Sequence, residues 1–297
     1  MNLFDKLVTE ALKKQPNLSP LRIVVEKELL HHDILRVLST ENLLKNLTFI
    51  GGTCLRCCYG GVRLSEDLDF TGGSDFSRGS LSTMGELLTE SLQDKYGLQV
   101  KVSSPTKDNH NKDNPNVDTW KIKIETRPQS KNLPAQRINI DICSISSYEK
   151  RPMMLLNPYD IDMGTSGLII QAQSREEIYA DKLIAFAFRN RIKHRDLWDI
   201  LWLHGQGLKP ALELIPHKIK DRNYTIDYFL NLFDEHKRLL TAKSEIETEF
   251  KQEMHRFLPQ ESIKKVLEQE NLWGFLTYLM EDLANQMMLF LGSQKSQ

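Results

Sequence analysis

The stretch FIGGTCLRCCYGGVRLSEDLDF, residues 49–70, constrains the fold more than any other part of the sequence. A short apolar run ends in Gly51-Gly52-Thr53, and a segment of helical character follows it. The stretch closes with Asp67 and Asp69, which are one residue apart and set between apolar residues. Because successive side chains of a strand alternate in direction, we expect both carboxylates on one face, about 6.5–7 Å apart.

Two carboxylates on one face of a core strand repel each other and are unfavourable to bury without a cation between them. A divalent metal suits this position, since hard cations take oxygen ligands. Alone, such a pair is more often found on an edge strand facing water. Glycines at a strand-to-helix turn, however, let the backbone approach a phosphate. The combination predicts a phosphate site at Gly51, Gly52 and Thr53 beside a metal site at Asp67 and Asp69.

Asp141 is the candidate for a third carboxylate. It lies within INIDI, residues 138–142, in the same alternating setting as Asp69. A strand paired beside residues 67–70 would place Asp141 on their face. The alternative is an exposed acid on a half-buried strand, and Glu125 competes for the same role.

The chain has three regions of different character. Residues 1–46 are expected to form N-terminal helices that pack on the core, with Ser19 and Pro20 at a helix start. Residues 47–172 are expected to form a mixed sheet with helices, including a helix at 81–96 and a surface loop at 103–116. Period-two alternation predicts strands at 47–50, 67–70, 98–102, 120–124 and 138–142.

The region from 173 to 297 carries helical patterns and is expected to be a separate helical domain. Ser174 and Glu177 fit a capping box at its first helix. The predicted fold class is therefore α+β, a mixed sheet flanked by helices with a helical C-terminal domain. The helices are predicted at residues 174–190, 196–204, 227–240, 243–258 and 261–291.

Composition excludes several classes of protein. Of the 297 residues, 40% are hydrophobic, and no run reaches the roughly 18 apolar residues of a membrane span. The N-terminus lacks the apolar segment of a signal peptide, so we expect a cytoplasmic protein with no membrane contact. Three of the four cysteines crowd one segment, which predicts reduced, packed thiols; a zinc site at Cys54 and Cys57 is the less favoured alternative. The net charge of −1 means that any nucleic-acid contact needs a local basic patch.

The quoted residues resemble the nucleotidyltransferase superfamily with the DNA polymerase β-like fold, whose signature is a glycine turn, a DxD pair and a later third acid. More narrowly, they look like the AbiEii/AbiGii toxin family, the toxin half of type IV toxin–antitoxin systems. Arg63 and Ser65-Glu-Asp67-Leu-Asp69-Phe70 match that family's first motif. Lys182 and Arg195-Asp196-Leu-Trp-Asp199 match its downstream lysine and acidic helix. The resemblance covers residues 47–203 and is loose over 72–137.

The resemblance implies a metal-dependent enzyme that moves a nucleoside monophosphate from an NTP to an acceptor hydroxyl. The acceptor it implies is the 3′ end of tRNA, whose extension would block translation and growth, and a cognate antitoxin encoded nearby is the implied partner. Mg²⁺ or Mn²⁺ would be held by Asp67, Asp69 and Asp141. The catalytic residues would be Asp67, Asp69, Lys182 and Asp196. The nucleotide-binding residues would be Gly51, Gly52, Thr53, Arg63, Ser65 and Lys182.

The spacing of the charged residues in the downstream motif, residues 182–199, also predicts which of them lie on the same side of a helix. Lys182 and Arg189 are seven residues apart on one helix stripe, and Asp196 and Asp199 share a face of the next helix. One of these acids could orient Lys182 or activate the attacking hydroxyl. The basic run between the two helices predicts RNA contacts at Arg189, Arg191, Lys193 and Arg195. Alternatively, this basic run has only a structural role: its cations stabilise the end of the first helix, and Asp196 caps the next helix.

Two other functions remain open at this point. The enzyme could act on a protein hydroxyl or a small molecule, as antibiotic-modifying nucleotidyltransferases do. The chain could also be a catalytically inactive binding protein that keeps the acids as a metal site and uses its helical half for docking.

Overall fold

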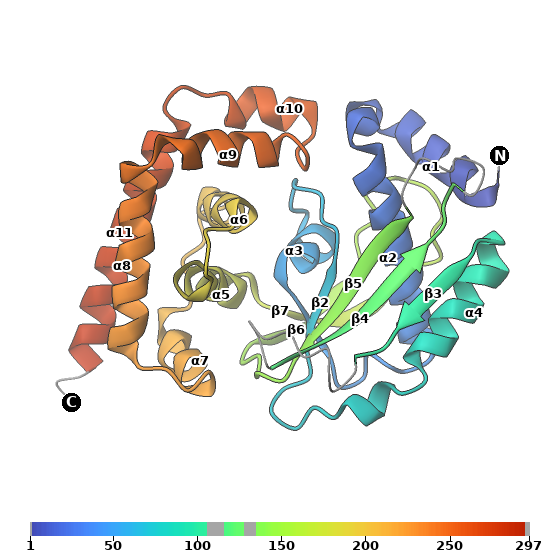
Figure 1. Cartoon of the computed structure of the whole chain (residues 1–297), viewed down its shortest axis with the longest axis horizontal. Helices are drawn as coiled ribbons and strands as arrows, with labels where there is room; N and C mark the ends of the chain where they lie inside the picture. Colours follow the sequence, from blue (N-terminus) through green and yellow to red (C-terminus); the bar gives the residue numbers. More distant parts are fainter. Residues whose placement is uncertain (1, 106–115, 128–134, 295–297) are drawn as a thin grey trace. The chain divides into compact units, whose positions relative to one another are not determined.

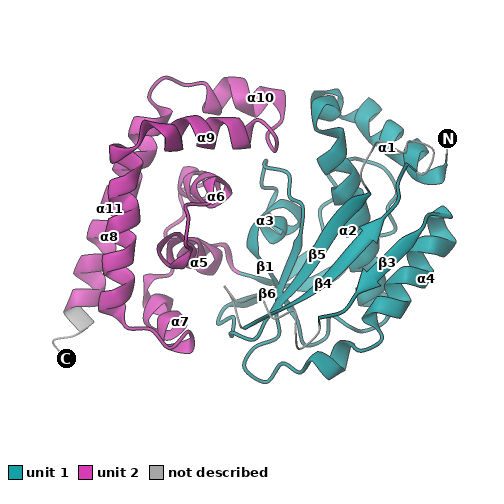
Figure 2. Ribbon diagram, viewed as in Figure 1, with its two compact units in different colours: residues 1–173 teal, residues 174–297 magenta. Residues whose placement is uncertain are grey.

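The computed structural model describes residues 2–105, 116–127 and 135–294 (Figure 1). It has two compact units, Met1–Gln173 and Ser174–Gln297 (Figure 2). In the described part of the chain, all strands lie in the first unit and the second unit is helical. The predicted α+β class is confirmed. Most of the loop predicted at 103–116 lies outside the described residues.

The sheet of the first unit has seven strands in the order β3-β4-β5-β2-β1-β7-β6. The pairs β2–β5 and β1–β7 are parallel and the other neighbours are antiparallel, so the predicted mixed sheet is confirmed. The five predicted strands are present, whereas β6 and β7 had no clear alternation in the sequence. The bounds are β1 Thr48–Ile50, β2 Leu68–Thr71, β3 Val100–Ser103, β4 Val117–Ile124, β5 Gln136–Cys143, β6 Lys150–Met154 and β7 Ile169–Gln173.

Helices α2 and α4 pack on each other and on strands β5 and β3 (Figure 1). The predicted start at Pro20 differs from the structure, because Pro20 belongs to a 3₁₀ turn and the α-helix begins at Arg22. The elements are α1 Leu3–Lys14, η1 Pro16–Leu21, α2 Arg22–Thr40, α3 Gly51–Tyr59, η2 Arg78–Leu81 and α4 Met84–Tyr96.

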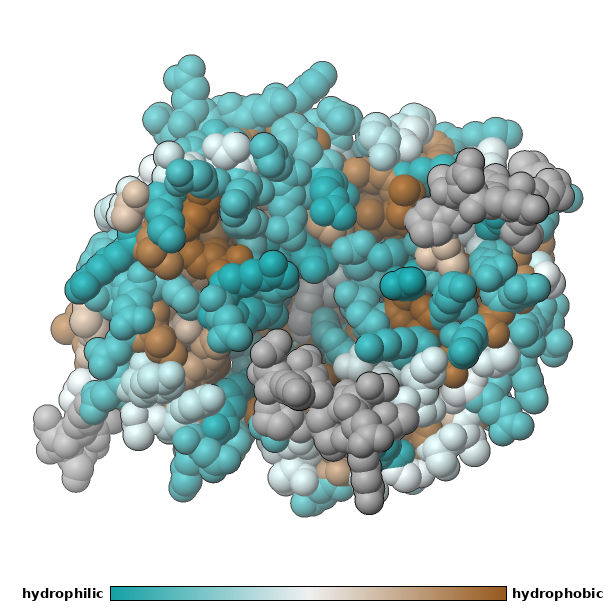
Figure 3. Space-filling model, viewed as in Figure 1, coloured by the Kyte–Doolittle hydropathy of each residue, from teal (hydrophilic) through white to brown (hydrophobic). Residues whose placement is uncertain are grey.

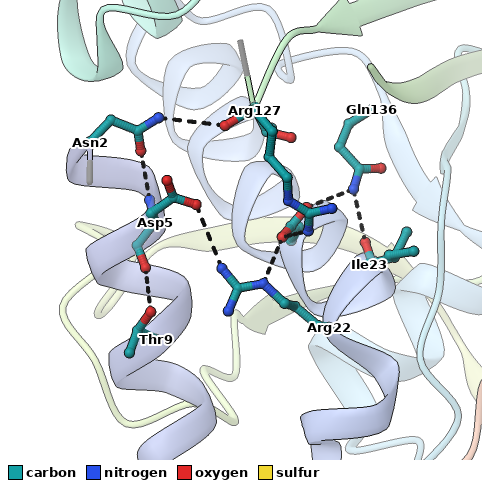
Figure 4. Close-up of polar contacts among 9 residues, drawn as sticks. Asn2, Asp5, Thr9, Arg22, Ile23, Arg127 and Gln136 are labelled. Carbon is teal, nitrogen blue, oxygen red and sulfur yellow. Dashed lines mark hydrogen bonds and ion pairs between the residues drawn. The ribbon is translucent and has the colours of Figure 1, made fainter. Parts of the chain in front are cut away.

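The N-terminal helices are tied to each other and to the sheet by polar contacts (Figure 4). Arg22 of α2 pairs with Asp5 of α1 at 3.5 Å and with Glu26 at 3.1 Å. Gln136 of β5 donates to Glu26 at 2.8 Å and to the carbonyl oxygen of Ile23 at 3.3 Å. Glu26 is buried, and burying a carboxylate without hydrogen-bond donors is unfavourable. These donors compensate the carboxylate for its lost hydration.

Helix α3 begins directly after β1 and carries the three clustered cysteines. Cys54, Cys57 and Cys58 are buried free thiols, as expected for packed reduced cysteines. Burial raises the pKa of Cys54 and Cys57 well above the usual value, so both stay protonated. The helix ends at Gly60, whose left-handed conformation (φ 74°) suits glycine at this position.

The second unit opens with the predicted capping box, in which Ser174 Oγ accepts from the Glu177 N–H at 3.0 Å. One prediction is wrong here: the helix expected at 261–291 is interrupted. A single turn and a π-helical turn end at Leu267, and the polar run Glu268–Asn271 separates them from α11. The elements are α5 Arg175–Phe188, α6 His194–Gly205, η4 Leu212–Leu214, α7 Ile215–Asp221, α8 Ile226–Ala242, α9 Ser244–Met254, α10 Gln260–Ser262, η5 Ile263–Leu267 and α11 Leu272–Gln294.

Hydrophilic residues cover most of the face shown in Figure 3, with apolar residues in small patches between them. No helix among the described residues combines the length and the apolar character needed to cross a membrane.

Candidate active site

Asp69 and Asp141, two of the three predicted acids, meet on one face of the sheet, and Asp67 directly precedes the strand that carries Asp69. Asp69 of β2 pairs in register with Asp141 of β5, and Thr119 of β4 lies opposite Asp141 on the other side. Residues paired in this way point to the same face. Their strand neighbours Leu68 and Ile140 are fully buried on the opposite face, while the acids are half-buried. The structure therefore places Asp141 beside Asp69, as the sequence analysis expected for a third carboxylate.

Hydrogen bonds from the neighbouring strands hold two of these carboxylates. The backbone N–H of Asn139 donates to Asp67 Oδ1 at 2.9 Å. Thr119 Oγ1 donates to Asp141 Oδ1 at 2.6 Å. Glu125, the competing acid, follows the far end of β4, beyond the pair of Ile124 with Gln136. It is therefore remote along the sheet from Asp141.

The glycine turn lies directly against the acids. Gly51 has φ 75°, and a Cβ at this position would lie 2.8 Å from Asp69 Oδ2. Only glycine can bring the start of α3 this close to the carboxylate. Gly51 and Gly52 occupy the first turn of α3, where backbone N–H groups have no partner inside the helix. Such N–H groups bind phosphates readily.

Burial raises the pKa of Asp141, and the negative charge of Asp67 raises it further. The hydroxyl of Thr119 and the charge of Lys121 act in the opposite direction but do not outweigh burial. A cation bound nearby would favour the charged form of this carboxylate.

The predicted acids have the chemistry of metal ligands, but their side chains are not arranged as a metal site. Carboxylate oxygens such as those of Asp67, Asp69 and Asp141 are the ligands that Mg²⁺ and Mn²⁺ prefer. Across residues 2–105, 116–127 and 135–294, however, no group of three or more His, Cys, Asp or Glu side chains is arranged to hold a metal ion. This finding also gives no support to zinc at the cysteines.

Thr53 and Ser65 form a buried link between the glycine turn and the acids. The Thr53 hydroxyl lies 2.6 Å from Ser65 Oγ and donates to the carbonyl oxygen of Asp67. Thr53 is fully buried. These bonds give its hydroxyl a role in holding Asp67 directly before β2, and its predicted contact with a phosphate stays a prediction. The same holds for Arg63, which is buried and donates to the Leu64 carbonyl oxygen at 2.9 Å.

Glu28 of α2 supports this link and was missed in the sequence. Its carboxylate accepts from the Ser65 N–H at 2.9 Å, pairs with Arg56 at 3.1 Å and accepts from the Tyr159 hydroxyl. Glu28 is buried, so these donors compensate the loss of its hydration. A charged residue on the buried side of an amphipathic helix is the signal that could have identified it.

In the second unit, α5 and α6 bring the downstream motif together. Lys182 Nζ lies 2.7 Å from Asp196 Oδ1 and 2.8 Å from Asp199 Oδ2. Arg189 pairs with Asp196 at 2.7 Å. Burial alone would raise the pKa of Asp196, but Lys182 and Arg189 outweigh burial and hold it below the usual value. Both acids therefore contact the lysine, and its predicted role toward a nucleotide stays a prediction.

The four predicted RNA-contact residues differ in their surroundings. Arg191 is exposed, and Arg189 is 44% exposed despite its bond to Asp196. Arg195 pairs with Glu253 at 3.3 Å and lies over the Phe257 ring at 4.9 Å, so it is already engaged. Burial, and to a smaller extent the charges of Arg191, Arg189 and Arg195, lowers the pKa of Lys193.

Residues 33–279 match the sequence model of the nucleotidyl transferase AbiEii toxin family of type IV toxin–antitoxin systems. No curated protein matches the chain. MenT4, a nucleotidyltransferase toxin from Mycobacterium tuberculosis H37Rv, has a similar structure, with a TM-score of 0.53, 17% identity and coverage of 77% of this chain and 70% of that one. JHP933 from Helicobacter pylori gives a TM-score of 0.48 at 15% identity, with 92% and 97% covered.

At 17% identity, the likeness to MenT4 speaks only for the fold. The family match is different in kind, because it spans more than half of the chain and contains the glycine turn, all three acids and the downstream motif. The chain therefore belongs to the AbiEii family of nucleotidyltransferase toxins of type IV toxin–antitoxin systems.

Proposed function

We propose that this nucleotidyltransferase toxin moves a nucleoside monophosphate from an NTP to the 3′ hydroxyl of tRNA and so blocks translation and growth. The observation that carries the proposal is the pairing of Asp69 with Asp141, with the Gly51 backbone against Asp69. A phosphate-binding helix start and a carboxylate face then occupy the same small region of the first unit. Phosphoryl transfer needs this arrangement, because positioning and charge neutralisation supply most of the rate.

We propose that Asp67, Asp69 and Asp141 hold Mg²⁺ or Mn²⁺. A divalent cation bound there would neutralise phosphate charge and lower the pKa of the acceptor hydroxyl. The bonds from Asn139 and Thr119 fix two of these carboxylates before any substrate arrives. Such preorganisation avoids reorganisation during the reaction.

In the reaction, the acceptor hydroxyl oxygen forms a bond to the α-phosphorus of the NTP. The bond from this phosphorus to the bridging oxygen breaks, and pyrophosphate leaves. The hydroxyl proton passes to a carboxylate of the acidic face and from there to water. The N–H groups of Gly51 and Gly52 bind phosphate oxygens, and Arg63 adds positive charge for the triphosphate. Within the second unit, Asp196 and Asp199 hold the ammonium group of Lys182.

The acceptor is inferred from local charge and from family membership. The segment 189–195 has four basic residues and no acid, although the whole chain has a net charge of −1. Clustered cations of this kind bind the nucleic-acid backbone. Membership in a toxin–antitoxin family also implies a cognate antitoxin as partner, which we propose to be encoded nearby.

The test incubates the full chain with each labelled NTP, a divalent cation, and either total tRNA or total protein. Label on tRNA that disappears in Asp69→Asn supports the proposal. Label on protein would show that the acceptor is a protein hydroxyl. No label in any mixture would indicate a binding protein without transferase activity. Circular dichroism of Asp69→Asn checks that its fold is intact.

A further inference from the structure

Three aromatic rings meet on the second unit where α5 ends, and we name Phe188, Tyr224 and Tyr228 the Phe188 cluster. The rings of Phe188 and Tyr224 are stacked, with centroids 4.6 Å apart and planes at 25°. The Tyr224 and Tyr228 rings lie 5.4 Å apart at 32°. Tyr224 is 49% exposed and Tyr228 is 48% exposed. The cluster thus presents nearly parallel aromatic surface to solvent.

Packing between α5 and α8 does not account for the two tyrosines. Phe229 and Phe233 fill the interior there, with 0% and 1% of their surface exposed. Phe229 contacts Phe188 at a centroid distance of 5.9 Å, and Phe233 contacts Phe186 at 5.0 Å. Tyr224 and Tyr228 therefore add exposed aromatic area outside a core that is already closed. Half-exposed aromatic rings gathered in one place are typical of binding surfaces.

Positive charge begins at the next residue. Arg189 follows Phe188 directly, and Arg191 is exposed two residues further on. The stretch of chain that carries the tyrosines has two acids, Asp221 and Asp227, and one cation, Arg222, which pairs with Asp181 at 3.7 Å. The connection between α5 and α6 therefore supplies most of the positive charge. Aromatic rings for bases and cations for phosphates, placed side by side in the chain, match the chemistry of a single nucleic-acid strand.

We propose that the Phe188 cluster stacks unpaired bases of the acceptor RNA, with Arg189 and Arg191 contacting the adjacent phosphates. The inference rests on the proposed function, because it takes RNA as the acceptor. Any base offers a ring face to an aromatic side chain, whereas a duplex hides these faces within its own stack. The surface therefore binds RNA through an unpaired segment and with little preference for sequence.

The test measures binding of the full chain to a short unstructured RNA and to the same sequence within a duplex. The double variant Tyr224→Leu/Tyr228→Leu removes the exposed rings and should bind the single strand about tenfold more weakly or worse. Tyr224→Phe/Tyr228→Phe keeps the rings and should bind as the wild type does. Tyr278→Leu is the matched control, since Tyr278 is 70% exposed on α11 in the same unit.

The salt dependence separates the two parts of the surface. Arg191→Ala should reduce the slope of log affinity against log salt by about 0.7, whereas the leucine double variant should leave that slope unchanged. Thermal unfolding of each variant checks the fold, and the phenylalanine variant keeps the test decisive if the leucine variant is unstable.

Several results would overturn the proposal. Equal RNA affinity of the wild type and the leucine variant would show that the cluster does not bind RNA. In that case, tRNA labelling by the wild type would still support the proposed function. An equal loss on duplex and single strand excludes stacking, as does a loss in the phenylalanine variant. A wild type that labels protein and binds no RNA defeats both proposals.

Discussion

Asp69 and Asp141 lie side by side at equivalent positions of two parallel strands, β2 and β5. Parallel neighbours require a long crossover, so the two residues are far apart in the sequence and meet only in the sheet. The chain between them supplies α4, β3 and β4, and β4 contributes Thr119 to the same row. The acidic face is thus a product of sheet topology.

Neutralising one acid of this face should abolish activity without unfolding the protein. Asp69→Asn and Asp141→Asn each remove a negative charge from the proposed cation site, and we expect transfer to fall by about 100-fold to 1,000-fold or more. Label transfer from NTP to tRNA measures the effect. Asp75→Asn is the control, because Asp75 is an exposed acid shortly after β2 and should be as active as the wild type. Full activity of both face variants would contradict the assignment.

Gly51→Ala should damage the site more than another left-handed glycine does. The added Cβ would lie 2.8 Å from Asp69 Oδ2, and the φ of 75° is unfavourable for alanine. Gly97→Ala is the matched control, since Gly97 has φ 62° and nothing within 4 Å of an added Cβ. We expect Gly97→Ala to lose about 1 kcal/mol of stability with full activity. Gly51→Ala should lose activity as well; equal activity of the two variants would show that the close approach is unimportant.

Thr53 should tolerate serine but not valine. Valine keeps the volume but removes the hydroxyl that bonds to Ser65 and to the Asp67 carbonyl, which leaves buried polar groups without that partner. We expect Thr53→Val to lose about 1–3 kcal/mol of unfolding free energy and most of the activity. Thr53→Ser restores the hydroxyl and should recover activity. Chemical denaturation and label transfer measure the two effects, and an inactive but fully stable serine variant would argue against the link.

Local patterns in the sequence predict the strands of the acidic face well, because β2 and β5 alternate clearly between apolar and polar residues. The donors to these acids escape prediction. Asn139 acts through its backbone N–H, which has no side-chain signature. Glu28 lies on α2 among buried polar residues such as His31 and Asp33, so a helix with an amphipathic pattern is in fact packed on nearly all sides. The interrupted helix before α11 also depends on tertiary packing.

Asp196→Asn should destabilise the second unit at neutral pH but not in acid. The folded pKa of Asp196 lies below its unfolded value of about 3.9, so its charge stabilises the folded state above that pH and the contribution is lost as pH falls below it. We expect the variant to be about 1–3 kcal/mol less stable at pH 7. The difference from the wild type should shrink below pH about 4. Glu281→Gln, an exposed partner of Lys237, should change stability by less than about 1 kcal/mol.

His31 and His32 should make the first unit sensitive to acid. Burial lowers the pKa of both rings from 6.5 to about 4, so the folded state keeps them neutral while the unfolded chain binds protons below pH 6.5. Stability is therefore greatest above pH 6.5 and falls as pH drops toward 4, by up to about 1.4 kcal/mol per pH unit for each ring.

His31 links this titration to the segment that carries Asp67. Its Nε2 lies 3.0 Å from the carbonyl oxygen of Glu66, the residue before Asp67. Its Nδ1 has no hydrogen-bond partner among the described residues, so an added proton there would be buried and unpaired. Urea unfolding of the wild type and of His31→Gln between pH 4 and 7 isolates this ring. The free-energy difference between them should change with pH in this window, and a constant difference would show that the pKa of His31 is the same in the folded and unfolded states.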